Sequence, residues 1–491
     1  MSDFGICPLC GHNCFSDDCL HATADYIAEI ARLKAEVIDA GLCTRCGSCV
    51  GVCPKGAIQF DDPLGEVLPM LIGECCDRGG CYASCPGKFV SWPELNAQVF
   101  GFPSGQAAAP NNFLVGQHLA AYVGYSTDEQ LRGNGASGGV ISAISAYLLE
   151  QGMVDGVITL IDSPQEPYRA IPQIITRREE VLAAAQSRYS ISPVNTILGS
   201  LAALPGRYAY VGLPCQVHSL RKLQAARYPG IEKIHYIIGT YCGNILHFDA
   251  VRSFLRRSGV SDLAQVRSLK YRAGTWPGRM EIRLHDGRIF GLEKFYANYL
   301  IPFYIMQRCL LCTDLTNEFA DISAGDGWTP VYEERGKGSN IVLVRTPVGA
   351  ALINEMREQA RLELHEISDE AVVNMHSHGL DLKKRGAFLR IAARTQVGKA
   401  VPQYGYELVT ATRARRLQET VIDLVFSICG RPLPRRLVNL IPVQGIGRLF
   451  KLLRKVWIRT TRSTKRSGLF QTQFRLTEDQ PPHAQADQCN G

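Results

Sequence analysis

The feature that most constrains this chain is a run of closely spaced cysteines, "CTRCGSCVGVCP", at residues 43–54. Its spacing is C-x2-C-x2-C-x3-C-P, which is the bacterial ferredoxin pattern for 4Fe-4S clusters. Three thiolates at this spacing wrap around one cluster, and the fourth reaches a second cluster. A zinc site more often uses two separated C-x-x-C pairs. The run therefore predicts a ferredoxin-type module with a second ligand run elsewhere.

That second run is "CCDRGGCYASCP", residues 75–86, and it is imperfect. Cysteines occupy its first, third and fourth ligand positions, but the second position holds Arg78, and Cys76 is a substitute ligand next to the first. In the crossed ferredoxin pattern, the first cluster takes Cys43, Cys46, Cys49 and Cys85. The second cluster takes Cys53, Cys75, Cys76 and Cys81. Residues 41–100 are thus predicted to form a bis-4Fe-4S head.

A further group of cysteines precedes the head, within a Cys-rich segment and helix at residues 1–40. These are Cys7, Cys10, Cys14 and Cys19. Their irregular spacing leaves structural zinc, an extra cluster and no metal all open. The chain has 491 residues, so its 18 cysteines are not needed to hold together a tiny fold. Because the N-terminus lacks the features of a signal peptide and no apolar run is long enough to span a membrane, we expect a cytoplasmic protein.

The body, residues 113–400, follows a linker rich in Pro, Gly, Ala and Asn at 102–112. Strand patterns such as "YAYVGLPCQV" (208–217) and "KIHYIIGTYCGN" (233–244) alternate with helical patterns. The segment "RMEIRLHDGRIFGL" predicts a hairpin that turns at Asp286-Gly287. The body is therefore expected to be a mixed α/β or α+β domain.

The body contains four cysteines, and four is the number that a 4Fe-4S cluster takes. They are Cys215, Cys242, Cys309 and Cys312. Each one alone would be interpreted as a buried core thiol. Because two of them form a C-x-x-C pair and two end predicted strands, the set together predicts a third cluster.

A glycine-rich turn, "GNGASGG" at residues 133–139, leads into a predicted helix at about 140–151. Such a turn offers free N–H groups and a helix dipole to an anion such as phosphate. An ordinary tight helix cap explains the same residues equally well, and both interpretations stay open.

Six segments, in order, resemble one known family, the beta subunit of coenzyme F420-reducing hydrogenase and its relatives, which include 7-hydroxymethyl chlorophyll a reductase. They are "GASGGVISAISAYLLEQGMVDGVI", "SRYSISP", "VGLPCQVHSLRK", "YCGN", "CLLCTD" and "ADISAGDGW". The resemblance implies FAD, the body cluster and electron transfer between a two-electron carrier and the head clusters. Its implied flavin contacts are Gly135, Ala136, Ser137, Gly138, Gly139, Arg188 and Tyr189.

The resemblance leaves the physiological reaction open among three functions. The first is an oxidoreductase that exchanges electrons with deazaflavin coenzyme F420 or a similar carrier. The second is a ferredoxin-dependent reductase of a specific organic substrate, and the third is a non-catalytic electron-wiring subunit of a larger complex. Lys270 and Arg272 are expected to be solvated strand residues rather than substrate contacts, and Asp326 is expected to cap a turn.

The tail is strongly basic. Residues 411–470 carry fourteen Lys and Arg against two acids, a net +12 in a chain of net +7. Within predicted tail residues 401–470, "GIGRLFKLLRKVWIRTTR" predicts a basic amphipathic helix. Such a helix suits an anionic inner membrane surface or an acidic partner, and a helix docked on the body with a solvated basic edge is the equal alternative. We expect no nucleic acid partner, and we expect residues 471–491 to be disordered.

Overall fold

The structure is a computed structural model, and it describes residues 27–60, 67–73, 75, 80–101, 112–328, 336–465 and 468–477. Several positions singled out in the sequence lie outside these ranges. They are Cys7, Cys10, Cys14, Cys19, Cys76, Arg78 and the predicted disordered residues from 478 onward.

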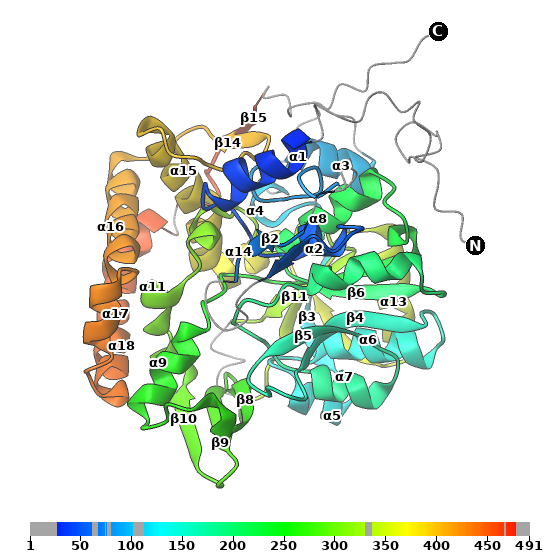
Figure 1. The fold of residues 1–491 in the computed structure, drawn as a ribbon, viewed down its shortest axis with the longest axis horizontal. Helices are drawn as coiled ribbons and strands as arrows, with labels where there is room; N and C mark the ends of the chain where they lie inside the picture. The colour runs from blue at the N-terminus through cyan, green and yellow to red at the C-terminus, as the bar shows by residue number, and fades with distance from the viewer. Residues whose placement is uncertain are drawn as a thin grey trace.

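The body is built on one eight-stranded sheet with the order β13-β3-β12-β11-β7-β6-β4-β5 (Figure 1). Its strands are β3 (Ala120–Ser126), β4 (Gly156–Asp162), β5 (Ala170–Ile175), β6 (Tyr208–Gly212), β7 (Ile234–Thr240), β11 (Ile322–Asp326), β12 (Asn340–Val344) and β13 (Leu362–Glu366). The four central strands β4, β6, β7 and β11 run parallel, and the outer pairings are antiparallel. The mixed α/β body predicted from the sequence is confirmed.

Helices cover both faces of this sheet, so its central strands are buried on both sides. In β12, Val342 packs with one face and Ile341 with the other, as the two-residue period of a strand requires. The first face carries α6 (Val140–Glu150), α7 (Arg178–Ala184) and α13 (Pro347–Glu358). The second face carries α8 (Pro214–Ala225), the 3-10 helix η2 (Val194–Ala202), α4 (Asn112–Val115) and α14 (Asp369–Leu380). The helix α5 (Glu129–Asn134) packs beside α6.

The head lies on the second face of the sheet, above α8 (Figure 1). Its elements are α1 (Ile27–Arg32), the π-helix η1 (Leu33–Ile38), α2 (Ser48–Gly51), β1 (Ile58–Phe60), β2 (Pro69–Leu71) and α3 (Trp92–Phe100). Gly51 of α2 packs directly on η2: a Cβ there would lie 2.2 Å from the Asn195 carbonyl oxygen, and one on Gly199 would lie 1.9 Å from the Gly51 oxygen. The buried Arg308 guanidinium also donates to the carbonyl oxygens of Leu42 and Gly87 in the head. Head and body therefore share one packed interface.

A smaller antiparallel sheet with the order β10-β9-β8 flanks the body. It comprises β8 (Val266–Ala273), β9 (Arg279–Leu284) and β10 (Ile289–Glu293), and around it lie α9 (Asp249–Arg257), η4 (Leu263–Gln265), α10 (Lys294–Ala297) and α11 (Leu300–Tyr304). The predicted hairpin is confirmed, since β9 pairs with β10 across the turn in which Gly287 has φ +90°. Two more 3-10 helices, η3 (Ile231–Lys233) and η5 (Gln307–Leu311), connect the larger elements.

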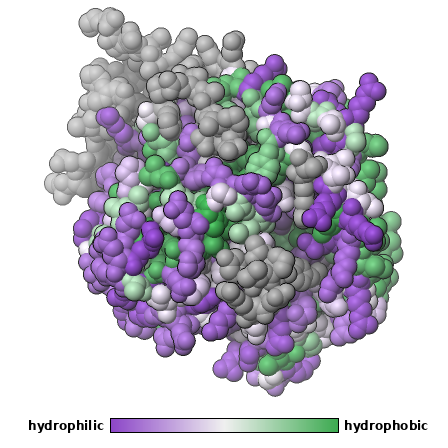
Figure 2. All heavy atoms as spheres, turned by 180° about the vertical axis from the view of Figure 1, so that it is seen from behind, coloured by the Kyte–Doolittle hydropathy of each residue, from purple (hydrophilic) through white to green (hydrophobic). Residues whose placement is uncertain are grey.

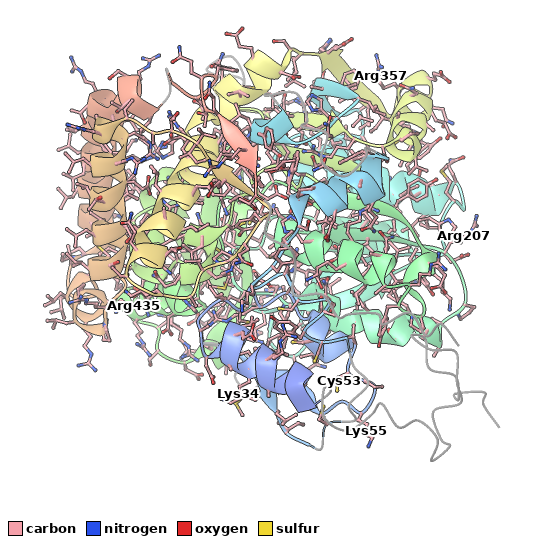
Figure 3. The ribbon with its side chains drawn as sticks, turned by 90° about the horizontal axis from the view of Figure 1, so that it is seen from above. Lys34, Cys53, Lys55, Arg207, Arg357 and Arg435 are labelled. Atoms are coloured by element: carbon pink, nitrogen blue, oxygen red, sulfur yellow. The ribbon has the colours of Figure 1, made fainter. Side chains whose placement is uncertain are left out.

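The tail docks along one edge of the molecule (Figures 1 and 3). It contains α16 (Arg413–Cys429), α17 (Pro432–Val438) and α18 (Val443–Lys465), which follow the π-helix η6 (Asp381–Gly386), α15 (Ala387–Gln396) and β14 (Tyr406–Leu408). Past α18, β15 (Phe474–Leu476) returns to pair with β14. Arg435, labelled in Figure 3, ties α17 to α11 by donating to the Phe303 carbonyl oxygen at 2.7 Å. Among the described residues, no helix is long and apolar enough to cross a membrane.

Buried ion pairs fasten this tail to the body. Asp381 of η6 is fully buried and contacts Arg385 at 2.6 Å, Arg415 at 2.9 Å and Lys465 at 3.6 Å. Glu419 of α16 forms ion pairs with Arg415, at 2.6 Å, and with Arg390 of α15. Burial, partly offset by Asp381, lowers the pKa of Lys465 to about 8. The helix is thus docked on the body, the arrangement that the sequence left equal to a helix on an anionic membrane surface or an acidic partner.

Candidate redox site

Four cysteines of the head line one small cavity beneath η1. They are Cys43, Cys46, Cys49 and Cys85, the set that the crossed ferredoxin pattern assigns to the first cluster. Burial, with smaller contributions from neighbouring cysteines, raises the pKa of Cys43 to about 11 and that of Cys85 to about 12. Four crowded, buried thiols can ionise together only beside positive charge, which is what iron supplies. The donor set therefore fits an iron–sulfur cluster.

The local backbone explains how this short loop surrounds a cavity. Arg45 and Gly47 both have left-handed conformations, with φ of +56° and +97°, which fold the loop back on itself before α2 begins. The backbone N–H of Gly87 donates to the Cys85 sulfur at 3.3 Å. Such N–H to sulfur bonds favour the thiolate over the thiol.

The second head set is described only in part. Cys53 is half-buried at the end of α2 and accepts from the Ala57 N–H at 3.2 Å. Cys75 is half-buried and Cys81 is buried, while Cys76 lies outside the described residues. The second cluster, with its uncertain fourth ligand, stays a prediction.

The fold brings the four body cysteines together. Cys215 starts α8 after β6, Cys242 follows the neighbouring strand β7, and Cys309 and Cys312 come from η5 and its end. Burial raises the pKa of Cys215, and the next contributions come from Cys46, Cys242, Cys312 and Cys309. Among the described residues, no three potential ligands are close enough to share a single metal ion. A four-iron cluster is wider than an ion, so its thiolates must stand farther apart.

Two buried cations that the sequence did not point to accompany the body cysteines. Lys383 of η6 is fully buried, donates to the Cys309 carbonyl oxygen at 3.4 Å, and has its pKa raised by the cysteines despite burial. Arg308 lies between this set and the head, and it donates to the Tyr404 hydroxyl at 3.0 Å. Lys383 is distant in sequence from these cysteines, and although Arg308 directly precedes Cys309, nothing in the local sequence indicates that its side chain is buried.

Head and body cysteines meet at the interface. After burial, Cys46 of the head makes the largest contribution to the raised pKa of Cys215, ahead of the other body cysteines. A buried network braces this contact: the Asn195 side-chain amide donates to Ser48 Oγ at 2.8 Å and to the Gln216 carbonyl oxygen at 3.0 Å. The Tyr210 hydroxyl in turn donates to Asn195. The two cysteine sets are therefore adjacent and rigidly positioned.

On the other side of the body cysteines lies a cavity of about 800 Å³, and Cys242 is part of its wall. It opens at the carboxyl ends of β6, β7 and β11, where the sheet changes from parallel β7–β11 to antiparallel β11–β12 pairing. Ligands of α/β sheets commonly bind outside the carboxyl ends of the parallel strands. The volume suits a cofactor-sized ligand.

Six of the seven residues predicted as flavin contacts line this cavity. They are Gly135, Ala136, Ser137, Gly139, Arg188 and Tyr189. Gly138 is not part of the wall, because it packs against protein: a Cβ there would lie 2.7 Å from both Asn340 Oδ1 and the Gly124 oxygen. The Arg188 guanidinium pairs with Asp162 at 2.8 Å. The turn is therefore packed tightly against protein at Gly138, while the residues on either side of Gly138 line the cavity.

One end of the cavity carries a polar cluster. Arg272 and Lys294 pair with Asp326 at 3.0 and 3.3 Å, and Arg272 also donates to the Tyr189 hydroxyl at 3.2 Å. Burial alone would raise the pKa of Asp326, but Lys294 and Arg272 outweigh it and lower that pKa. His376 donates through Nε2 to the Asp326 carbonyl oxygen at 2.7 Å, and burial lowers its pKa.

Two expectations from the sequence are wrong at this cluster. Arg272 is 3% exposed rather than solvated, whereas Lys270 on the same strand is exposed as expected. Asp326 ends β11 and faces two cations in the cavity wall instead of capping a turn. Strict two-residue alternation would place Lys270 and Arg272 on the same face of β8, but the register of β8 shifts between Lys270 and Ala273, and the two residues differ in burial. Since the partners of Arg272 come from other elements, only the fold reveals this contact.

The cavity also contains buried polar atoms without protein partners. Arg272 Nη2 and the Tyr241 hydroxyl have no hydrogen-bond partner among the described residues. A buried, unsatisfied guanidinium nitrogen is costly unless a ligand accepts from it. The wall thus fits a ligand with anionic or carbonyl oxygens.

Comparison with known families agrees with this arrangement. Residues 121–199 and 206–370 match the N- and C-terminal parts described as "Coenzyme F420 hydrogenase/dehydrogenase, beta subunit", and residues 36–59 match the 4Fe-4S binding domain. The F420-dependent sulfite reductase of Methanocaldococcus jannaschii is 27% identical over 68% of this chain, and the match covers about half of that relative, 48%.

Two shorter relatives are subunits or chains of larger enzymes by name. The coenzyme F420 hydrogenase subunit beta of Methanococcus voltae is 29% identical over 58% of this chain and 99% of its own length. A chain of the F420-reducing [NiFe] hydrogenase complex from Methanosarcina barkeri is similar with a TM-score of 0.48 and 20% identity, over 60% of this chain and 98% of that one. The chain thus belongs to the coenzyme F420 hydrogenase/dehydrogenase beta subunit family, with a 4Fe-4S binding domain ahead of the family region.

Proposed function

We propose that the protein is a flavin- and iron–sulfur-dependent oxidoreductase that moves electrons between a two-electron carrier, coenzyme F420 or a similar deazaflavin, and 4Fe-4S clusters. The observation that carries the proposal is the contiguity of three sites. Cys242 lies in the cavity wall, the body cysteines adjoin it, and Cys215 lies beside Cys46 of the head. The three sites follow one another in the order that electron transfer from a two-electron cofactor to one-electron clusters would require.

Each group of residues would have a separate role in the proposed function. Cys215, Cys242, Cys309 and Cys312 would hold the body cluster, and Cys43, Cys46, Cys49 and Cys85 the first head cluster. A flavin in the cavity would supply the conversion between hydride and single-electron chemistry. The wall at Gly135, Ser137 and Gly139 would accommodate it.

The charged side chains would orient ligands and set potentials. Arg272 and Lys294, partly neutralised by Asp326, leave net positive charge at one end of the cavity, which favours phosphate or carboxylate groups. Lys383 and Arg308 place two buried positive charges beside the body cysteines. A nearby cation stabilises the reduced, more negative form of a cluster and so raises its reduction potential.

A direct experiment tests the proposal. We would purify the full chain anaerobically, measure iron and flavin, and add reduced F420 while following the flavin and cluster spectra. We expect about twelve iron atoms per chain for three clusters, one flavin, and cluster reduction by the carrier. Bound flavin and clusters that ignore F420 but are reduced by ferredoxin would instead favour a ferredoxin-dependent reductase. Absence of bound flavin after reconstitution would contradict the proposal.

Arg272 gives a prediction at the level of one side chain. Arg272→Gln removes the positive charge and the unpartnered Nη2 while keeping similar bulk. Because a hydrogen bond to a charged group contributes about 1.5–3 kcal/mol, flavin affinity should fall about 10- to 100-fold, while iron content stays unchanged. Titration of flavin-free protein by fluorescence quenching measures the change. Arg267→Gln, an exposed position on the same strand, is the matched control, and equal affinities in the two variants would remove Arg272 from the site.

A further inference from the structure

We propose that the outer face of the tail helices α16, α17 and α18 docks the protein on an anionic membrane surface. We call this the docking face, and its apolar side chains are all exposed. They are Leu417, Val421, Leu424, Val425, Ile428, Leu433, Leu437, Leu440, Ile441, Leu449, Leu452, Leu453 and Val456. These are thirteen of the 22 large exposed apolar residues in the described part of the chain, within one 40-residue stretch. Figure 2 shows such residues gathered along the edge that these helices form, at the right of that view.

Helical spacing shows that the exposure belongs to faces rather than to scattered residues. In α16 the exposed positions follow the pattern i, i+4, i+7, i+8 and i+11 from Leu417. In α18 they follow i, i+3, i+4 and i+7 from Leu449. Both patterns form one stripe along a helix. A stripe of this size on a soluble surface marks an interaction site.

The opposite faces of the same helices are already used. In α16, Arg415, Glu419 and Ile422 are buried. In α18, Gly447 lies against Tyr296: a Cβ there would be 2.8 Å from the Tyr296 Cβ. Each helix therefore has one face that packs on the body and a second face, the stripe, that is exposed in the described part of the chain.

The charge around the stripes identifies the occupant. Nine basic side chains of these helices are exposed: Arg413, Arg416, Arg431, Arg436, Arg448, Lys451, Lys455, Arg459 and Arg462. The two acids of this region do not offset them, since Glu419 is buried in its ion pairs and Asp423 is half-buried. A second copy of the chain would bring a like-charged face against this one, so self-association is disfavoured.

The shape favours a lipid surface over a protein groove. The helices have 17 and 23 residues, which makes them about 25 and 35 Å long. Both are long amphipathic helices with an apolar stripe bordered by basic residues, as interfacial helices have. Such helices insert aliphatic side chains below the lipid headgroups, while their Lys and Arg side chains stay at the level of the headgroups. None of the described helices can span a bilayer, so contact would be peripheral.

Vesicle sedimentation of the full-length, cofactor-loaded protein tests this proposal. We expect binding to vesicles of equal parts phosphatidylglycerol and phosphatidylcholine, and roughly ten-fold weaker binding or none to pure phosphatidylcholine. Raising the salt concentration should release the protein, because the charge contribution is screened.

Surface variants test whether vesicle binding depends on the docking face and not only on the overall charge of the protein. The double variant Leu449→Asp and Leu453→Asp should weaken binding to anionic vesicles roughly 30-fold, since both apolar contacts are lost and two acids are added. The control pair, Leu119→Asp and Val397→Asp, also changes exposed apolar residues but lies outside the tail helices, and it should bind as the natural protein does.

A second pair of variants tests the contribution of charge to vesicle binding. Arg448→Glu with Lys455→Glu should reduce binding more than Lys399→Glu with Arg267→Glu, which reverses two exposed charges away from the docking face. Melting curves and flavin content confirm that each variant is folded. The proposal fails if the natural protein does not sediment with anionic vesicles at low salt. It also fails if both members of each matched pair bind alike, or if light scattering shows a dimer that the Leu449 and Leu453 changes dissociate.

Discussion

Replacing Cys312 by serine should remove about four iron atoms per chain and stop electron flow from the cavity to the head. Cys312 belongs to the body set, which lies between the cavity, where Cys242 forms part of the wall, and Cys46 of the head. A serine hydroxyl is a poor ligand for iron at neutral pH, so the body cluster should not assemble. The head cysteines, held by a different loop, should keep their iron.

Two measurements check this result. Iron analysis should show the loss of one cluster, and rapid mixing with reduced F420 should reduce the flavin without reducing the remaining clusters. Cys429→Ser, a half-buried cysteine of α16 outside both sets, is the matched control and should keep full iron and full transfer. If Cys312→Ser keeps its iron, the body cysteines do not bind a cluster.

Replacing Asp381 by alanine should destabilise the protein by about 3–5 kcal/mol or more, because it leaves buried cations without their shared partner. Asp381 is fully buried and lies within 3.6 Å of Arg385, Arg415 and Lys465. The pKa of Lys465 is already lowered to about 8, and without Asp381 the buried lysine should lose its proton more readily. Since the folded pKa lies below that of a free lysine, the variant should regain stability as the pH rises past that folded pKa.

Urea unfolding followed by circular dichroism, at two pH values on either side of 8, measures both effects. The control is Asp39→Ala, which removes an exposed acid paired with Lys34 at 2.5 Å and should cost no more than about 1 kcal/mol. Limited proteolysis should cut first in the tail of the Asp381 variant. Equal stabilities of the two variants would mean that the buried network does not hold the tail.

Sequence reasoning succeeded where the signal was local. The spacing of Cys43, Cys46 and Cys49 predicted an iron–sulfur domain, and the match of residues 36–59 to a 4Fe-4S binding domain bears out that class. Asp286-Gly287 predicted its hairpin because a short turn depends on its own residues. The resemblance of six short segments, taken in order, predicted the family that the comparisons show.

It failed where partners come from distant parts of the chain. Arg272 and Asp326 were expected to be ordinary surface and turn residues, yet 54 positions apart they pair in the cavity wall. The docked tail depends on Asp381 meeting Lys465, which no periodicity in either segment reveals. Gly138 was expected to face a cofactor, but Asn340 and Gly124 approach it so closely that there is no room for a side chain.

The contact between Gly51 and Gly199 has a consequence for how fast electrons can move. Backbone meets backbone there with no room for a single methyl group, so the head is not a tethered arm that swings between a donor and an acceptor. In the proposed path, the packed interface would hold the clusters bound by the head and body cysteines at one separation, so electron transfer between them would need no conformational gate. The rate of that step should therefore be insensitive to solvent viscosity, unlike that of enzymes whose carrier domains must diffuse between docking positions.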